Sequence, residues 1–295
     1  MIRFERHSVH FGEVWFDEPV AVPQPDVLVV RHSRIRPNGD GYTVKLSLVT
    51  DLTSEEEVIW NGLHTDCRRQ IRRAQAAGLQ LAEAHRPTDE NEILEFVDFY
   101  NRFAAVKGIS GISVSYLHTI AAEGRLWLSS VSSESETLAR HSCIATGSTV
   151  RALYGAAIFR SVNPELQRAI SGAHRQLHWM DVVRYKAAGF ETYDWGGLFA
   201  DEAIAGSKGV NDFKRQFGGR PIEYFESEQA LTLRGWLYLR LRPGLLVARS
   251  AVRRSLAKLR APVPPRAAGE THEAAPLQPS GDEPLAVAVK RVRAT

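Results

Sequence analysis

The sequence has 295 residues, of which 44% are hydrophobic and 24% are charged, as in an ordinary globular protein. This length allows a substantial core in one large domain or two small ones. The net charge of only +3 does not by itself favour nucleic acid or a membrane as a partner. The two cysteines, Cys67 and Cys143, lack the spacing of a disulfide framework or a structural zinc site, so we expect no metal and a reducing compartment.

The N-terminal residues carry charges throughout and contain no apolar run of the kind found in signal peptides. No apolar stretch reaches the roughly 20 residues that a membrane span requires. We therefore expect a cytoplasmic protein.

The first fifty residues alternate apolar and polar side chains, which is typical of short strands. We expect these strands at Val14–Phe16, Val27–Val30 and Tyr42–Val49. A helix is expected from Thr53 or Ser54, because three glutamates follow in its first turn, where the helix dipole favours negative charge. Its apolar residues keep helical spacing until Gly78, which ends it.

The middle of the chain alternates between strands and helices. We expect strands at Leu79–Ala84, Leu126–Val131, Thr137–Ala145, Val150–Phe159, Phe190–Trp195 and Ile222–Phe225. We expect helices at Glu90–Val106, Val114–Glu123, Pro164–Ala188 and Val210–Phe217. Pro164 suits the start of its helix, and Gly189 follows its end.

The C-terminal part of the sequence is basic. Between Leu231 and Arg260 there are eight basic residues and no acidic one. Apolar residues recur at helical spacing over 245–260, which predicts a basic amphipathic helix. After Pro262 the chain is rich in proline, alanine and glutamate without periodicity, and we expect it to be disordered.

The order strand, two helices, three strands, long helix, strand, helix, strand is that of the GNAT acyltransferase fold. More specific motifs are Trp60-x-x-Leu63-x4-Arg68-x-x-Ile71-Arg72-Arg73-Ala74-x3-Gly78, Leu153-Tyr154-Gly155-Ala156, His178-Trp179-Met180 with Ala188-Gly189-Phe190, and Tyr193-Asp194-Trp195-Gly196-Gly197 followed by Gly209-x3-Phe213-Lys214-x-x-Phe217-Gly218-Gly219. Through them the chain resembles the Fem-type aminoacyltransferases and related acetyltransferase-like proteins often found with bacterial surface-polysaccharide genes.

This resemblance implies an α/β (α+β) protein with a GNAT-like acyltransferase fold, whose mixed sheet is splayed at its centre. Fem-type chains contain two GNAT-like halves, and here the first half looks truncated. We therefore expect a partial GNAT-like half at 1–78, with the arginine-rich helix, and a GNAT-like domain at 79–228. The basic helix would occupy 229–262, and 263–295 would form a disordered tail.

In this fold the acyl donor lies between the splayed strands, so residues that end the strand at 190–195 are candidate site residues. Gly196 and Gly197 would make room for the acyl group, or form a tight turn. Asp194 is a candidate base for the attacking ammonium, or a carboxylate that accepts from amides of the following turn. Lys214, placed near the start of its helix, is expected to act with the N-terminal amides on a phosphate or ester oxygen, or else to be solvated. The resemblance also places this lysine near the donor.

Other candidates come from neighbouring elements. Tyr154 would donate a hydrogen bond to the ligand or pack in the core, and His174 would be a base or a structural residue. Glu202 would bind the acceptor amine or be solvated. Among four clustered arginines, Arg68 and Arg72 match family positions and would bind a polyphosphate or carboxylate, or form a solvated face.

The resemblance implies an N-acyltransferase that moves an acetyl or aminoacyl group onto an amine of a cell-envelope or surface-polysaccharide precursor. The donor would be acetyl-CoA or aminoacyl-tRNA, with no tightly bound cofactor. The CoA-binding pattern [QR]-x-x-G-x-[GA] is not matched before the long helix, where Gln167 and Gly172 are too far apart, and this weakens the case for CoA.

The acceptor would be a small-molecule or lipid-linked amine. Residues 245–260 would contact the inner face of the membrane, or bind tRNA, or pack on the fold. The alternative function is a catalytically inactive GNAT-like module that binds a nucleotide sugar, tRNA or a protein partner.

Overall fold

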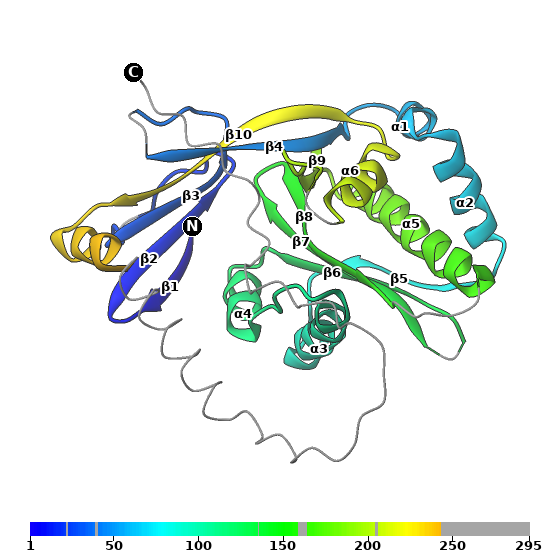
Figure 1. The fold of residues 1–295 in the computed structure, drawn as a ribbon, viewed down its shortest axis with the longest axis horizontal. Coiled ribbons are helices and arrows are strands. Elements are labelled where there is room, and N and C mark those ends of the chain that lie inside the picture. Colours follow the sequence, from blue (N-terminus) through cyan, green and yellow to red (C-terminus); the bar gives the residue numbers. More distant parts are fainter. Residues whose placement is uncertain (22, 39–40, 135, 159–163, 204–205, 243–295) are drawn as a thin grey trace, which may run out of the picture.

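A computed structural model describes residues 1–242, with gaps at 22, 39–40, 135, 159–163 and 204–205. Within these residues, ten strands form one mixed sheet, and helices lie against it (Figure 1). The strand order is β1-β2-β3-β10-β4-β9-β8-β7-β6-β5. The predicted class, an α/β fold with a mixed sheet, is therefore confirmed.

The N-terminal strands and the last strand form one half of the sheet. Their bounds are β1 Ile2–Arg6, β2 Val9–Trp15, β3 Val27–Ser33, β4 Tyr42–Asp51 and β10 Arg220–Ala230. Strand β10 lies between β3 and β4 and is antiparallel to both. The last strand of the sheet therefore pairs with strands from the N-terminal part of the chain. The sheet thus runs without interruption across the predicted boundary at residue 78, and the division into two halves stays a prediction.

The other half of the sheet carries the crossover helix. Its strands are β5 Gln80–His85, β6 Leu126–Ser132, β7 Thr137–Thr146, β8 Thr149–Ala157 and β9 Thr192–Gly197. The helices are α1 Glu56–Gly62, α2 Thr65–Gln75, α3 Glu90–Lys107, α4 Val114–Ala122, α5 Pro164–Ala187 and α6 Ser207–Arg215. Helix α5 connects the parallel neighbours β8 and β9, as a parallel connection requires.

Both faces of this half-sheet are covered, because side chains alternate along each strand. On β6, Leu126 and Leu128 pack in a cluster with α3 and α4, whereas Trp127 packs with α1, α2 and α5. Figure 1 shows α3 and α4 on one side of β6–β8 and α5 on the other. The strands are therefore sandwiched between two helical layers.

The sheet is splayed between β8 and β9. The two strands pair in parallel only from Thr149 with Thr192 to Arg151 with Asp194. Beyond this point β8 continues to Ala157 along β7, while β9 continues to Gly197 along β4. The predicted central splay is confirmed, and it opens at the carboxyl ends of the two strands.

Two local features differ from the prediction. Strand β1 was not predicted, because its turn into β2 uses His7 and Ser8 at positive φ (52° and 59°) instead of the usual glycine or asparagine. The single helix expected from 53 to 78 is two helices. Leu63 is extended at the end of α1, and the His64 side chain accepts a hydrogen bond from the Asp66 amide and caps α2.

At the C-terminal end, residues 233–242 are helical, and the predicted basic helix at 245–260 and tail at 263–295 lie outside the described residues. Among the described helices, none combines the length and apolar character needed to cross a membrane.

Candidate functional site

The end of β9 forms a tight, crowded turn beside the splay. Gly196 has φ of +80°, a conformation that side chains disfavour. A Cβ there would lie 3.3 Å from the Ala152 carbonyl oxygen and 3.3 Å from Lys214 Nζ. Gly196 is therefore required both by the backbone conformation and by the close approach of the Lys214 amine.

Asp194 is completely buried directly before this turn. Its Oδ1 accepts hydrogen bonds from Ser47 Oγ at 2.5 Å and from the Gly196 amide at 2.7 Å. Its Oδ2 is buried with no hydrogen-bond partner in the described part of the chain. One oxygen thus fixes the turn, as the structural alternative for this residue predicted, and the other keeps acceptor capacity.

Lys214 brings its amine to the same place from α6. Nζ donates to the Gly197 carbonyl oxygen at 2.8 Å. Burial, reinforced by the positive charge of Arg151 and opposed by Asp194, lowers the pKa of Lys214 from 10.5 to about 8. This amine is therefore mostly protonated at neutral pH but releases its proton far more readily than a solvated lysine.

The predicted place of Lys214 in its helix is wrong. Helix α6 begins at Ser207, so Lys214 lies in its last turn and not near its N-terminal amides. The lysine side chain, rather than the helix terminus, is what α6 presents to the end of β9. Its neighbour Arg215 pairs with Glu202 and Asp212 on the exposed side.

A second charged chain, which the sequence analysis missed, leads from the splay into the N-terminal half. Arg151, the last β8 residue paired with β9, has Nε 4.0 Å from Asp194 Oδ1 and donates to His32 Nε2 at 3.1 Å. Nδ1 of His32 lies 3.1 Å from Glu226 Oε1. Although burial opposes it, the His32 contact and Arg31 lower the pKa of Glu226 to about 2. These residues fix the Arg151 guanidinium beside Asp194.

Of the remaining candidates, Tyr154 lies on the α3 side of the sheet. Its ring contacts Tyr100 at 5.2 Å between centroids, and burial raises its pKa. No contact described here joins Tyr154 to Asp194 or Lys214. Tyr154 thus packs in the core, which was the second of the two alternatives predicted for it.

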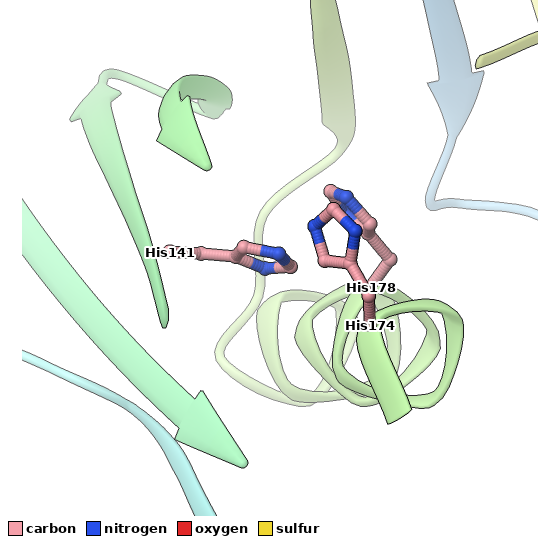
Figure 2. A group of neighbouring side chains, drawn as sticks. All are labelled: His141, His174 and His178. Atoms are coloured by element: carbon pink, nitrogen blue, oxygen red, sulfur yellow. The ribbon is translucent and has the colours of Figure 1, made fainter. Parts of the chain in front are cut away.

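His174 belongs to a separate cluster in the same half of the molecule. It lies on α5 beside His178, and both rings approach His141 of β7 (Figure 2). The sequence analysis singled out His174 alone. Because β7 and α5 are far apart in the sequence, no local pattern revealed that these three rings meet.

The outer candidates are engaged in contacts of their own. Arg68 donates to the Asn61 carbonyl oxygen at 2.9 Å, and the Arg72 guanidinium lies 5.4 Å from the centre of the Trp60 ring. Glu202 accepts from Asn211 at 3.0 Å and from Arg215 at 2.9 Å. The structure thus brings together Asp194, Gly196, Gly197 and Lys214. It does not bring Arg68, Arg72 or Glu202 into contact with these four residues.

Two other arginines of the predicted cluster, Arg69 and Arg73, line a hollow of about 450 Å³ together with Arg168 of α5. Gly172 of α5 faces α2 here: a Cβ on it would lie 3.4 Å from the Gln70 carbonyl oxygen, an ordinary van der Waals contact. Arg68 and Arg72, the two arginines predicted to bind an anion, do not line this hollow, and anion binding by the cluster stays a prediction.

Comparison with known proteins supports the fold. No protein-family model and no curated protein matches the sequence. The structure is similar to a crystal structure of FemX, with a TM-score of 0.51 and 14% identity over 66% of this chain. The match covers 63% of the FemX chain, less than two thirds of its length.

Two further similar structures have lower TM-scores. One is the C-terminal domain (DUF2156) of a putative lysylphosphatidylglycerol synthetase from Agrobacterium fabrum, with a TM-score of 0.47, 13% identity and coverage of 72% of each chain. The other is L-PGS from Bacillus licheniformis, with a TM-score of 0.44, 12% identity and coverage of 73% and 72%. Because both scores are below 0.5, the fold assignment rests on FemX and on the splayed sheet.

The chain therefore has the Fem-type, GNAT-like fold that its motifs predicted. At 14% identity the likeness to FemX establishes this fold and not the reaction.

Proposed function

We propose that this protein is an N-acyltransferase that moves an acetyl or aminoacyl group onto an amine of a cell-envelope or surface-polysaccharide precursor. The observation that carries the proposal is the splay between β8 and β9, with the half-buried Lys214 amine and the buried Asp194 carboxylate where β9 ends. The place where two strands diverge beside an amine of lowered pKa is where a reacting ester or thioester would be held.

In the proposed reaction, the acceptor nitrogen forms a bond to the acyl carbon of the donor. The C–S bond of a thioester, or the C–O bond of a tRNA ester, then breaks. The acceptor ammonium first loses one proton to a base. After the attack the same nitrogen loses a second proton, which ends on the leaving sulfur or oxygen. The oxyanion of the tetrahedral intermediate needs a donor, and the protonated Lys214 amine supplies one.

Asp194 has the complementary role in this proposal. With Oδ1 held by Ser47 and the Gly196 amide, Oδ2 is the carboxylate oxygen left to accept the proton or hydrogen bond of the acceptor amine. The Arg151 guanidinium, 4.0 Å from Oδ1, places a positive charge beside this carboxylate.

The arginine hollow supports a donor that carries phosphates. Arg69, Arg73 and Arg168 would bind the phosphates of CoA or of a tRNA end, which both present several negative charges. Both acetyl-CoA and aminoacyl-tRNA are therefore kept as candidate donors, without a tightly bound cofactor.

The helical residues 233–242 support a lipid-linked acceptor at the inner face of the membrane. Four large apolar side chains on this segment are exposed: Leu233, Trp236, Leu237 and Leu241. Arg234 and Arg240 lie on the same short segment. Apolar and basic side chains together are the chemistry that binds an anionic membrane surface, and the predicted helix at 245–260 would extend it.

The test offers acetyl-CoA and charged tRNA separately, each with candidate amino sugars, and detects products by mass spectrometry. The proposal expects an acylated amine with one donor, and loss of this product in the Lys214→Met variant. If the folded protein binds a donor but forms no product with either, the binding-module alternative holds instead.

A further inference from the structure

Three histidines converge on one point in the interior. His141 comes from β7, and His174 and His178 come from α5, four residues apart and so on one face of the helix. One ring nitrogen from each lies within 4.8 Å of the other two. Figure 2 shows the His141 ring pointing from its strand toward the two rings above the helix.

Each of these rings has a nitrogen without a partner. His141 Nε2, His174 Nε2 and His178 Nδ1 are buried and make no hydrogen bond within the described residues. A buried polar atom left unsatisfied destabilises the folded state, so three such atoms close together are unfavourable in an ordinary core. A shared ligand would satisfy all three.

The cluster also has a residue that orients it. His141 Nδ1 donates to Asp181 Oδ2 at 2.7 Å, and both side chains are buried. With its proton on Nδ1, the ring leaves the Nε2 lone pair free toward the other histidines. A carboxylate behind a histidine is the usual means of fixing the tautomer of a metal ligand.

Room for a ligand exists because residue 155 of β8 is glycine. A Cβ there would lie 3.3 Å from His141 Cδ2 and 3.8 Å from both His141 Nε2 and His174 Nε2. Gly155 is exposed and belongs to the part of β8 beyond its pairing with β9. Two of the three nitrogens, His141 Nε2 and His174 Nε2, therefore adjoin the space that a side chain at position 155 would occupy.

We propose that His141, His174 and His178 bind one divalent transition-metal ion, with Zn²⁺ as the best fit, and leave a fourth position open toward Gly155. Three imidazole nitrogens are a donor set that suits Zn²⁺, and three protein ligands with one open position are typical of catalytic rather than structural zinc.

Binding requires only a small contraction of the cluster. Tetrahedral coordination at about 2.0–2.1 Å places ligand nitrogens about 3.3 Å apart, so the rings must close by about an ångström or more.

The surroundings hold the ligands in place. The His174 ring stacks on Phe213, and the His178 ring contacts Phe217 and Trp195 at 5.2 and 5.3 Å between centroids. This aromatic wall limits ring rotation and excludes water from one side. A metal ion here would act as a Lewis acid at the splay. The proposed site does not depend on acyl transfer and stands or falls separately.

Titration of the chelator-treated full-length chain with Co²⁺ tests the site, because tetrahedral Co²⁺ shows intense visible d–d bands. We expect saturation at one Co²⁺ per chain and reversal by Zn²⁺. His174→Ala and His178→Ala should weaken the affinity by at least about 100-fold, and Asp181→Asn by about 10- to 100-fold.

His118→Ala is the matched control, since this histidine lies on α4 and pairs with Glu90; it should bind Co²⁺ as the wild type does. Absence of d–d bands in the wild type, or equal binding by the wild type and both α5 variants, would overturn the proposal. Should an alanine variant not fold, judged by circular dichroism, the wild-type titration and the Asp181→Asn variant still decide.

Discussion

Two polar clusters adjoin the splay, and they differ in how far the protein itself completes them. Around Asp194 and Lys214, charges of both signs meet and most donors and acceptors have protein partners. In the cluster of His141, His174 and His178, a buried nitrogen of each ring lacks a partner among the described residues. In the first cluster folding satisfies Asp194 Oδ1 and the Lys214 amine and leaves Asp194 Oδ2 without a partner among the described residues. In the second, the proposed metal ion would satisfy one nitrogen of each ring.

The difference shows that burial alone does not define a site. The charged cluster can be preorganised for chemistry without any bound group, because Ser47, the Gly196 amide and the Gly197 carbonyl hold its members in place. In the histidine cluster, Asp181 and aromatic side chains hold the rings in place. One nitrogen of each ring is left without a partner among the described residues.

The largest expected effect concerns Lys214. Lys214→Met should lower kcat/KM for the proposed acyl transfer by about 10²- to 10³-fold, because the oxyanion loses a charged donor. Steady-state assays with the active donor measure this. Lys208→Met on the same helix is the control, since Lys208 is exposed and pairs with Asp212. Equal losses of kcat/KM in both variants would show that Lys214 has no specific role in the reaction.

A second change separates structural from chemical roles in the charged cluster. Asp194→Ala should lower the free energy of unfolding by about 3 kcal/mol, because it strands the Ser47 hydroxyl and the Gly196 amide in the interior. Urea denaturation measures the loss. Asp98→Ala, which removes an exposed carboxylate on α3, should change stability much less. An unchanged midpoint for Asp194→Ala would show that this network is not formed.

Gly155→Ala sharpens the comparison from the histidine side. The added methyl group would press on His141 Cδ2 at 3.3 Å and hinder closure of the rings. We expect Co²⁺ affinity to fall about tenfold, equivalent to about 1.4 kcal/mol of overpacking. Since Gly155 is not among the glycines at positive φ, its backbone can accommodate alanine, and the fold should survive. Tighter metal binding by this variant would contradict the geometry described here.

The smallest effect is a pH dependence of stability. The folded-state pKa of Lys214, about 8, is below its unfolded value of 10.5. Between these values the unfolded chain binds the extra proton, so stability rises with pH through this window, by about 1 kcal/mol after allowance for partial exposure. Comparing unfolding of the wild type and Lys214→Met from pH 7 to 10.5 isolates this slope. A fall in stability specific to the wild type would contradict it.

Much of the fold could be predicted from the sequence, since helical spacing and turn residues mark most elements. The long helix was expected at Pro164–Ala188 and is Pro164–Ala187. Strand β1 and the break at Leu63–His64 were missed because each depends on backbone conformations that those residue types adopt only in context.

The candidate site was predictable where its residues are close in the sequence and not elsewhere. Asp194, Gly196 and Gly197 share one strand end, and the resemblance supplied Lys214. Arg151 and the histidine cluster were missed because their contacts join elements that are far apart in the sequence. His141, for example, meets His174 only because β7 lies under α5. The expectation of no metal came from cysteine spacing and left the histidines out.

The most direct test of the contrast between the two clusters is a crystal of this protein soaked in Zn²⁺, with anomalous differences measured at the zinc absorption edge. The account predicts one dominant peak between the rings of His141, His174 and His178, and no peak at Asp194, whose surroundings are cationic. A zinc peak at Asp194, or no peak among the three histidines, would contradict it.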